Sequence, residues 1–323
     1  MSRKVAPSAV SSGRFTGGGT SAAHLRRPNL FVIGAMKSGS TFLSRLLDVH
    51  PAIYIARPEE PSYFVAQEQL RALWPAMWYQ GYWRSEEAYL RLFEPGGDAP
   101  LIGEASTNYS KIPLAIGVPE RIARFAPDAR FVYIMRDPVE RSISHYWHMV
   151  RFNGEHRPMF AALQTDPGYL AVSHYAMQLA PYLTLFGRER VFTLTFEELT
   201  QQTASTMRWL YASLGVDPSV ELPPDFDVPE NVTPESVQRP ALGGLLNRLR
   251  WSRPMQQLVP RVPQGLRAVA KRITSETVHR HAVDRSAAIA FLRHVQQPQT
   301  AELSAILGRD FPEWTTLRGT SAT

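Results

Sequence analysis

Cysteine is absent from this sequence, which excludes disulfide bonds, thiolate metal sites and cysteine nucleophiles. No apolar run approaches the roughly 20 residues that a membrane-spanning helix needs. The first 27 residues contain no acidic residue and no apolar core of the kind a secretory signal has. They hold five basic residues among many serines, glycines and alanines, so we expect residues 1–27 to form a disordered basic tail. An organelle transit peptide is the alternative interpretation of that composition.

The 323 residues, 44% of them hydrophobic, are enough for one large domain or two small ones. The net charge of +6 is uneven, because residues 239–280 contain nine basic residues against the single acid Glu276. This basic stretch predicts an anionic partner: a nucleotide, an acidic glycan or a membrane surface that the protein would contact peripherally. Nucleic acid is not expected, because Trp251 is the only aromatic residue of the stretch and no nucleic-acid motif is present. The sequence carries no signal of the oligomeric state.

Residues 30–48 combine a strand, a loop and a helix. The first four residues are an apolar run typical of a buried strand, and the residues from Phe42 onwards are apolar at helical spacing. The loop between them, residues 34–41, is rich in glycine and hydroxyl groups. Such a loop presents backbone N–H groups and the positive end of a helix dipole to an anion. A simple turn between a strand and a helix is the alternative.

Within this loop, Gly34, Gly39 and Thr41 fit the spacing of a phosphate-binding P-loop. Ser40 occupies the position of the lysine that reaches the outer phosphates in nucleotide hydrolases, and Lys37 lies inside the loop instead. The displaced cation predicts that this loop binds an anion other than the nucleoside triphosphate of nucleotide hydrolases, with a different leaving group.

A second junction between a strand and a helix carries a candidate phosphate-binding pair. Residues 131–135 are apolar, Arg136 follows them, and Asp137 and Pro138 suit the cap and the first position of a helix. Ser144 then lies about two turns into that helix. Arg136 and Ser144 can bind one phosphate together, with the guanidinium making two parallel hydrogen bonds. The alternative is an ordinary capped helix with a surface arginine and serine.

Two further features predict the rest of the site and the fold. A proline-flanked loop around Glu59 and Glu60 would hold a carboxylate beside the anion loop, although a solvated turn with surface acids fits equally well. Residues 101–104 are typical of a short strand, and the polar residues 105–109 follow it, as in sites of open α/β sheets. Strands alternate with helices along the chain. We therefore predict an α/β fold with a mainly parallel central sheet flanked by helices.

Together, the two junctions resemble the sulfotransferase superfamily that uses 3′-phosphoadenosine 5′-phosphosulfate (PAPS). Lys37-Ser38-Gly39-Ser40-Thr41 resembles its 5′-phosphosulfate loop, and Arg136-Asp137-Pro138-x-x-Arg141-x-x-Ser144 resembles its 3′-phosphate motif. The resemblance extends from about Pro28 to Trp314. It implies a P-loop-like fold in a single sulfotransferase domain over residues 28–323. The spacing of apolar residues predicts amphipathic helices over residues 242–307, so we expect a helical C-terminal part from about residue 240. The resemblance also implies transfer of the sulfuryl group from PAPS by in-line displacement, without a metal.

The nearest subgroup by resemblance is that of the heparan-sulfate and related bacterial carbohydrate sulfotransferases. Glu60-Pro61-Ser62-Tyr63-Phe64 resembles their E-P-x-F-F segment, whose glutamate is the general base, so the match implies that Glu60 is the base. Gly103-Glu104-Ala105-Ser106 resembles their G-E-K-[ST] segment, with Ala105 in place of the lysine. The resemblance implies that Lys37 neutralises charge on the bridging oxygen. The implied nucleotide-binding residues are Lys37, Ser38, Gly39, Ser40, Thr41, Arg136, Ser144 and, as a candidate for a late 3′-phosphate loop, Arg239.

These motifs do not specify the acceptor. The subgroup favours a carbohydrate or glycolipid hydroxyl, with a lipid or secondary-metabolite hydroxyl as the alternative, and implies a soluble, bacterial-type protein of the cytoplasm. Two other functions are weighed against this one. A P-loop kinase or nucleotide hydrolase would use magnesium and ATP, and Ser40 argues against it. A non-enzymatic module would bind anionic glycans through the basic stretch.

Overall fold

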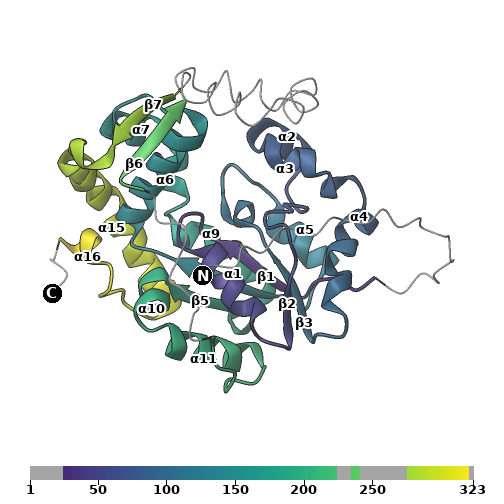
Figure 1. Ribbon diagram of the computed structural model, residues 1–323. Coiled ribbons are helices and arrows are strands. Elements are labelled where there is room, and N and C mark those ends of the chain that lie inside the picture. The colour runs from purple at the N-terminus through teal and green to yellow at the C-terminus, as the bar shows by residue number, and fades with distance from the viewer. Residues whose placement is uncertain (1–24, 224–233, 241–274, 320–323) are drawn as a thin grey trace, which may run out of the picture.

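A computed structural model of the protein describes residues 25–223, 234–240 and 275–319. Its central sheet has five parallel strands in the order β2-β3-β1-β4-β5 (Figure 1). The strands are β1 (Leu30–Gly34), β2 (Ile53–Ile55), β3 (Leu101–Ala105), β4 (Arg130–Met135) and β5 (Val191–Thr195). The predicted α/β fold with a mainly parallel central sheet is therefore confirmed.

Helices connect the strands and cover both faces of the sheet. The α-helices are α1 (Ser40–Asp48), α2 (Gln67–Leu73), α3 (Pro75–Gln80), α4 (Glu86–Leu90), α5 (Val118–Phe125), α6 (Pro138–Asn153), α7 (Met159–Thr165), α8 (Gly168–Ala171), α9 (Tyr175–Phe186), α10 (Phe196–Gln201), α11 (Thr203–Leu214), α15 (Ser286–Leu307) and α16 (Thr315–Arg318). Short 3-10 turns are η1 (Tyr82–Arg84), η2 (Arg91–Gly96), η3 (Thr107–Ser110), η4 (Arg188–Arg190) and η6 (Arg280–Ala282). No helix in the described part of the chain is long and apolar enough to cross a membrane.

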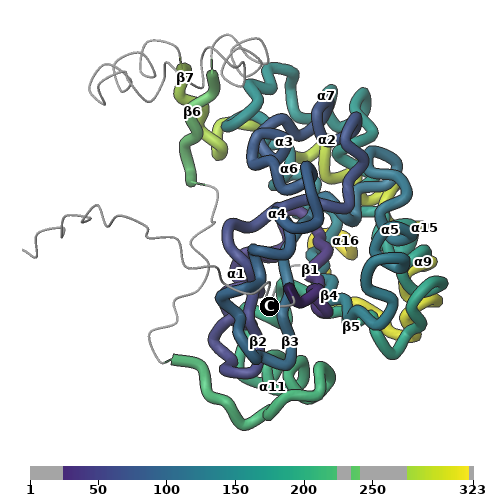
Figure 2. The backbone as a smooth tube through the Cα atoms, turned by 90° about the vertical axis from the view of Figure 1, so that its right-hand side faces the viewer, coloured from purple at the N-terminus to yellow at the C-terminus, as the bar shows by residue number. Residues whose placement is uncertain are grey.

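Alternate residues of each strand face opposite sides of the sheet, and both sides are buried. On β1, Leu30 and Val32 belong to a core cluster shared with α1, α10 and α11. Phe31 and Ile33 belong to a second cluster, shared with α5, α6 and α9. Figure 2 shows α1 on one side of the sheet and α5, α9 and α15 on the other. The loop after β1 is thus anchored in the interior of the protein.

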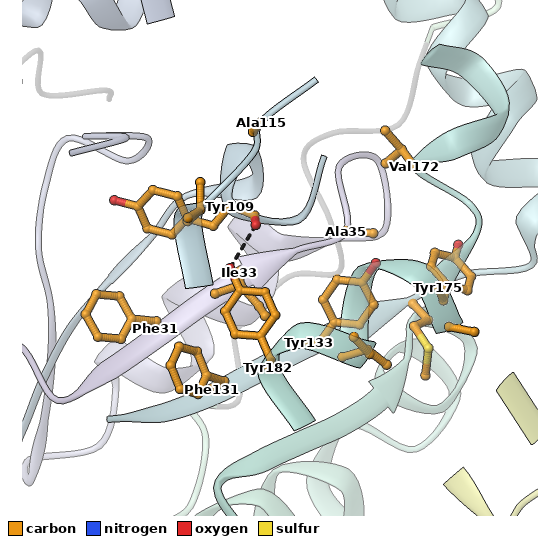
Figure 3. Packing of buried hydrophobic residues seen from close by; sticks show 14 of the residues in the cluster. Phe31, Ile33, Ala35, Tyr109, Ala115, Phe131, Tyr133, Val172, Tyr175 and Tyr182 are labelled. Carbon is orange, nitrogen blue, oxygen red and sulfur yellow. Dashed lines mark hydrogen bonds between the residues drawn. The ribbon is translucent and has the colours of Figure 1, made fainter. Parts of the chain in front are cut away.

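Aromatic side chains fill much of the second cluster (Figure 3). Phe31 stacks on Phe131 with their ring centroids 5.7 Å apart, and the Phe131 centroid lies 5.0 Å from that of Tyr182. The Tyr182 hydroxyl donates to the backbone carbonyl of Tyr109 at 2.8 Å. This bond ties α9 to η3, so the core fixes the segment that follows β3.

The strand order places a switch point beside β1. From β1 the chain reaches β2 at one edge, returns to β3 next to β1, and then crosses to β4 on the other side of β1. Ligands of open α/β sheets bind outside the carboxyl ends of the strands at such a point. Beyond those ends lie the glycine loop after β1, η3 after β3 and Arg136 after β4.

The C-terminal part, predicted to be helical from about residue 240, is only partly so. Strands β6 (Ser236–Pro240) and β7 (Ser275–His279) form an antiparallel ribbon, and β6 lies against α6. Val237 is buried in this contact, which favours a strand whose alternate residues face the helix. Helices α15 and α16 follow as expected. Residues 1–24 of the predicted basic tail and residues 241–274 lie outside the described residues.

Gly103 on β3 provides a test of this packing. A Cβ at Gly103 would lie 2.2 Å from the carbonyl oxygen of Leu30 on β1. Because both backbones are held by neighbouring strands, Gly103→Ala should force β1 and β3 apart and lower the free energy of unfolding by about 1–3 kcal/mol. The midpoint of urea denaturation measures this loss. Gly168→Ala is the control, since its Cβ would meet only side-chain atoms, Asp166 Oδ1 at 3.1 Å and Leu114 Cδ1 at 3.7 Å. Equal midpoints for the two variants would contradict the prediction.

Candidate active site

The loop between β1 and α1 has the backbone shape of an anion cradle. Lys37 adopts φ +69° and Gly39 φ +91°, both left-handed, so the chain turns sharply before α1 begins at Ser40. Gly39 also has no room for a side chain, because a Cβ there would lie 2.7 Å from the ring of Phe196. Turns of this kind direct successive backbone N–H groups to one point beside a helix N-terminus.

The hydroxyl residues of the loop have different surroundings. Ser38 is fully buried, whereas Ser40 and Thr41 are half-buried in the first turn of α1. Thr41 Oγ1 donates to Glu59 Oε2 at 2.9 Å. Burial raises the pKa of Glu59, and this hydrogen bond opposes the rise. The proline-flanked acidic loop therefore lies directly beside the anion loop, as its place in the sequence predicted.

Positive charge converges on this loop. Burial lowers the pKa of Lys37, and the guanidinium groups of Arg136, Arg151 and Arg141 lower it further. Arg136 follows β4 directly, and its guanidinium lies over the ring of Phe196, 5.0 Å from the centroid. Like charges gathered in a partly buried region favour the binding of a polyanion, which would relieve their mutual repulsion.

Helix α6 begins as the sequence predicted. Asp137 caps it, accepting from the backbone N–H of Val139 at 2.9 Å, and Pro138 is its first residue. Arg141 is fully buried and donates to the carbonyl oxygen of Tyr169, so this arginine anchors the helix internally. Ser144 lies in the second turn of α6 and stays partly accessible.

Arg239 and Arg280 differ in their relation to this site. Arg239 on β6 makes an ion pair of 2.5 Å with Glu276 on β7. Arg280 begins η6, just after β7, and burial lowers its pKa, as do the nearby guanidinium groups of Arg285 and Arg136. Arg280 also borders a cavity of about 480 Å³. The structure thus brings Arg280 into the field of Arg136, which sequence reasoning missed, while Arg239 has a carboxylate partner of its own.

The Glu60 carboxylate is held by one oxygen. The backbone N–H of Glu60 donates to the carbonyl oxygen of Ala105 at 2.8 Å, and this bond joins the acidic loop to the end of β3. Glu60 Oε1 accepts from Thr107 twice, from the hydroxyl at 2.6 Å and from the backbone N–H at 3.1 Å. Glu60 Oε2 is buried and has no hydrogen-bond partner among the described residues. The two aromatic residues that follow, Tyr63 and Phe64, pack into an aromatic cluster with Tyr89.

Glu104, the other carboxylate of this region, has a structural role. It is fully buried and accepts three hydrogen bonds: from Tyr89 at 2.5 Å, Ser106 at 2.6 Å and Tyr109 at 2.7 Å. Burial raises its pKa to about 7, although these hydroxyls oppose the rise. Because it is fully buried and both of its oxygens already accept hydrogen bonds from neighbouring hydroxyls, Glu104 is enclosed by the core and not exposed to a substrate.

Two histidines of α6 lie close to the same cations. Burial lowers the pKa of His148 to about 3, with Lys37 and Lys111 adding to the effect. Burial also brings the pKa of His145 well below its usual value, and Arg141 lowers it further. Both imidazoles are therefore neutral near pH 7 and add no charge to the site.

Sequence reasoning placed Thr107 in the polar stretch after β3 without giving it a role, and it did not single out Lys111, just beyond that stretch. Thr107 orients Glu60, and the charge of Lys111 acts on Glu60 and on both histidines. The available signal was their position after the carboxyl end of a strand next to β1. In the part of the chain that the structure describes, no three His, Cys, Asp or Glu residues gather as a metal site.

The fold and this site together define an α/β protein with a P-loop-type anion site. Residues 28–219 match the sulfotransferase family. Because this match spans more than half of the chain, the protein belongs to that family. The crystal structure of a sulfotransferase from Alicyclobacillus acidocaldarius is similar, with a TM-score of 0.57 and 27% identity, covering 90% of this chain and 99% of that one.

Curated relatives match smaller parts of this chain. A membrane-associated sulfotransferase of Dictyostelium discoideum is 33% identical over 125 residues, 39% of this chain and 24% of that protein. A bifunctional heparan sulfate N-deacetylase/N-sulfotransferase of Bos taurus is 24% identical over 209 residues, 60% of this chain and 22% of that protein. Carbohydrate sulfotransferase 15 of Mus musculus is 24% identical over 250 residues, 60% and 45% of the two chains. This chain thus spans less than half the length of these three relatives.

Glu104→Gln tests the structural role of the buried carboxylate. An amide cannot accept all three hydroxyl hydrogens, so the free energy of unfolding should fall by about 1–3 kcal/mol. Because the pKa of Glu104 is raised from 4.5 to about 7, the folded protein keeps a proton in this window that the unfolded chain has lost. The stability of the wild type should therefore decrease as the pH rises through this window, and the variant should lack this component. Parallel urea titrations at pH 5 and pH 8 measure both effects; a constant difference would contradict the second.

Proposed function

We propose that this protein is a PAPS-dependent sulfotransferase that transfers the sulfuryl group to an acceptor hydroxyl. The observation that carries the proposal is that Lys37 and Arg136, beyond the carboxyl ends of β1 and β4, interact electrostatically, while the loop of Glu60 is hydrogen-bonded to the end of β3 and, through Glu59, to the anion loop. Two cations suit the binding of a polyanionic donor. A carboxylate with hydrogen bonds at only one oxygen suits the removal of a proton from an acceptor.

Lys37 and the loop around it would bind the donor. Backbone N–H groups of residues 37–41, with the hydroxyls of Ser40 and Thr41, would hold the 5′-phosphate at the N-terminus of α1. Lys37 would neutralise the charge that develops on the bridging oxygen as the S–O bond breaks. This loop lacks the lysine of nucleotide hydrolases at Ser40, which supports a sulfuryl rather than a phosphoryl donor.

Arg136 and Ser144 would bind the 3′-phosphate, the group that distinguishes PAPS from ATP. Arg136 suits this role because it lies at the end of β4, and its position over the Phe196 ring orients its guanidinium. Arg239, the candidate for the late 3′-phosphate loop, would first have to leave Glu276. No metal is required by this proposal, because side-chain cations of the chain would meet the charge of the donor.

Glu60 would be the general base. Oε1 is fixed by Thr107, and the buried Oε2 is free to accept the proton of the acceptor hydroxyl. Transfer of this kind passes through a loose transition state by analogy with phosphoryl transfer, so positioning and charge stabilisation dominate. A positioned base contributes about 10²- to 10⁴-fold to the rate.

The acceptor class is supported by the names of the relatives. The names of carbohydrate sulfotransferase 15 and of the heparan sulfate N-deacetylase/N-sulfotransferase support a carbohydrate acceptor for this chain. Within that class we favour a carbohydrate or glycolipid hydroxyl. A lipid or secondary-metabolite hydroxyl is the second candidate.

Calorimetric titration with adenosine 3′,5′-bisphosphate tests the donor. The wild type should bind this nucleotide more tightly than ATP with magnesium, because only the bisphosphate carries a 3′-phosphate. Arg136→Ala should weaken binding about 10- to 100-fold, since a charge-assisted hydrogen bond contributes about 1.5–3 kcal/mol. Arg208→Ala, at an exposed position on α11, is the matched control.

Three outcomes would count against this assignment. A preference for ATP would favour the kinase, and equal affinities of the wild type and Arg136→Ala would remove Arg136 from the 3′-phosphate site. Binding of an acidic glycan without either nucleotide would favour the non-enzymatic module.

Glu60→Gln tests the base. Glutamine keeps the shape of the side chain but cannot take up a proton, so turnover should fall about 10²- to 10⁴-fold. Adenosine 3′,5′-bisphosphate should still bind as in the wild type. Sulfate transfer from radiolabelled PAPS to a desulfated heparan oligosaccharide, a galactosyl lipid and a long-chain alcohol measures turnover, with Glu68→Gln as the exposed control. Full activity of Glu60→Gln would show that another group is the base.

A further inference from the structure

Lys111 is a buried ammonium with few partners. It lies just after η3 and is 6% exposed. Its Nζ donates to Asn108 Oδ1 at 2.6 Å and lies over the ring of Trp74, 5.3 Å from the centroid. The described residues provide no other hydrogen-bond acceptor to this nitrogen, which carries three N–H donors. Burying an ammonium with unused donors is costly unless a further acceptor arrives.

Hydrogen bonds connect Lys111 to the loop that carries Glu60. Asn108 Nδ2 donates to Ser62 Oγ at 3.0 Å, and Ser62 Oγ donates to the backbone carbonyl of Glu60 at 3.3 Å. Thr107, in the same turn as Asn108, holds the Glu60 carboxylate. One short segment, η3, therefore positions both an ammonium and a carboxylate.

The charge of Lys111 acts within the site. Burial lowers its pKa to about 8, Arg141 lowers it further and Glu60 opposes the shift. Lys37 and Lys111 both lower the pKa of the same two imidazoles, so the two lysines lie near the same pair of rings. The titratable and charged groups that interact with Lys111 are Glu60 of the acidic loop and Arg141, His145 and His148 of α6, and Lys37 of the anion loop acts on the same two histidines.

We propose that Lys111 is a second catalytic lysine, whose ammonium binds the non-bridging sulfuryl oxygens beside Glu60 while Lys37 acts on the bridging oxygen of the donor. This inference rests on the proposed function. In the transfer step the acceptor oxygen forms a bond to sulfur and its proton passes to Glu60, while the bond from sulfur to the 5′-phosphate oxygen breaks and leaves its electron pair on the bisphosphate. Lys111 exchanges no proton; it holds charge on the moving group through its unused N–H donors.

Lys111→Met tests this role, because methionine keeps an unbranched side chain as far as Cε and lacks the charged nitrogen. Loss of one donor to developing charge should lower kcat about 10²- to 10³-fold. The affinity for adenosine 3′,5′-bisphosphate should stay within about twofold of the wild type, because that product has no sulfuryl group; twofold is a small change on the energy scale of a hydrogen bond. The acceptor panel is the one described above, and transfer to water is followed in the same samples. Arg208→Ala is again the control.

The pH dependence separates this role from a structural one. Activity of the wild type should fall as the pH rises through about 8, because Lys111 loses its proton there. In Lys111→Arg the guanidinium stays charged, so the alkaline limb of kcat/KM for PAPS should move to higher pH and much of the kcat lost in Lys111→Met should return.

The outcomes distinguish three cases. If Lys111 is merely structural, Lys111→Met should lose thermal stability and affinity for the bisphosphate together, and Lys111→Arg should keep the wild-type pH profile. This result would overturn the inference. A kcat of Lys111→Met within about threefold of the wild type would overturn it as well, since that is far below the contribution of such a donor. If the wild type neither binds the bisphosphate nor releases it from PAPS, the proposed function itself is wrong.

Discussion

Repulsion among partly buried cations is the constraint on which this site depends. Lys37 and Arg141 each have a lowered pKa, mainly because of burial, and Arg136 lowers both further. The Arg141 guanidinium donates to Ser173 Oγ and to the carbonyl oxygen of Tyr169, so it stays in the protein interior. The two apolar layers of the sheet supply the burial that holds these charges in place. A protein can retain such a cluster where a polyanion neutralises it, which is what a nucleotide donor with several phosphate and sulfate oxygens would do.

Two carboxylates on neighbouring segments show how packing divides their roles. Glu104 accepts three hydroxyl donors in the aromatic layer, so it holds β3 to α4 and η3. Glu60 approaches the same turn from the other side and receives hydrogen bonds from Thr107 at one oxygen only. Because the Tyr182 hydroxyl fixes η3 to α9, the aromatic core indirectly determines where the Glu60 carboxylate lies. The position of the candidate base is thus a property of the core and not of its own loop alone.

The local features of the fold could be predicted from the sequence, and the long-range pairings could not. The cap at Asp137, the first helical position of Pro138 and the glycine turn before α1 follow from rules that act over a few residues. The contact between Glu60 and Thr107 and the proximity of Arg280 to Arg136 depend on strand order and on a ribbon whose two strands are far apart in the chain. Periodicity in residues after 240 therefore pointed to helix and missed the β6–β7 pairing, and with it the position of Arg280.

Position 105 is an alanine where the G-E-K-[ST] segment that it resembles has a lysine. Ala105 is buried among the apolar residues on the α1 side of the sheet, so no charged group extends from the end of β3. Its backbone carbonyl still accepts from Glu60, because that bond needs no particular side chain. At the far end of η3, the Lys111 ammonium is held by Asn108 and Trp74, and the charge of Glu60 raises its pKa. On the proposal made above, Lys111 would therefore supply the positive charge near Glu60 that the alanine at position 105 cannot supply.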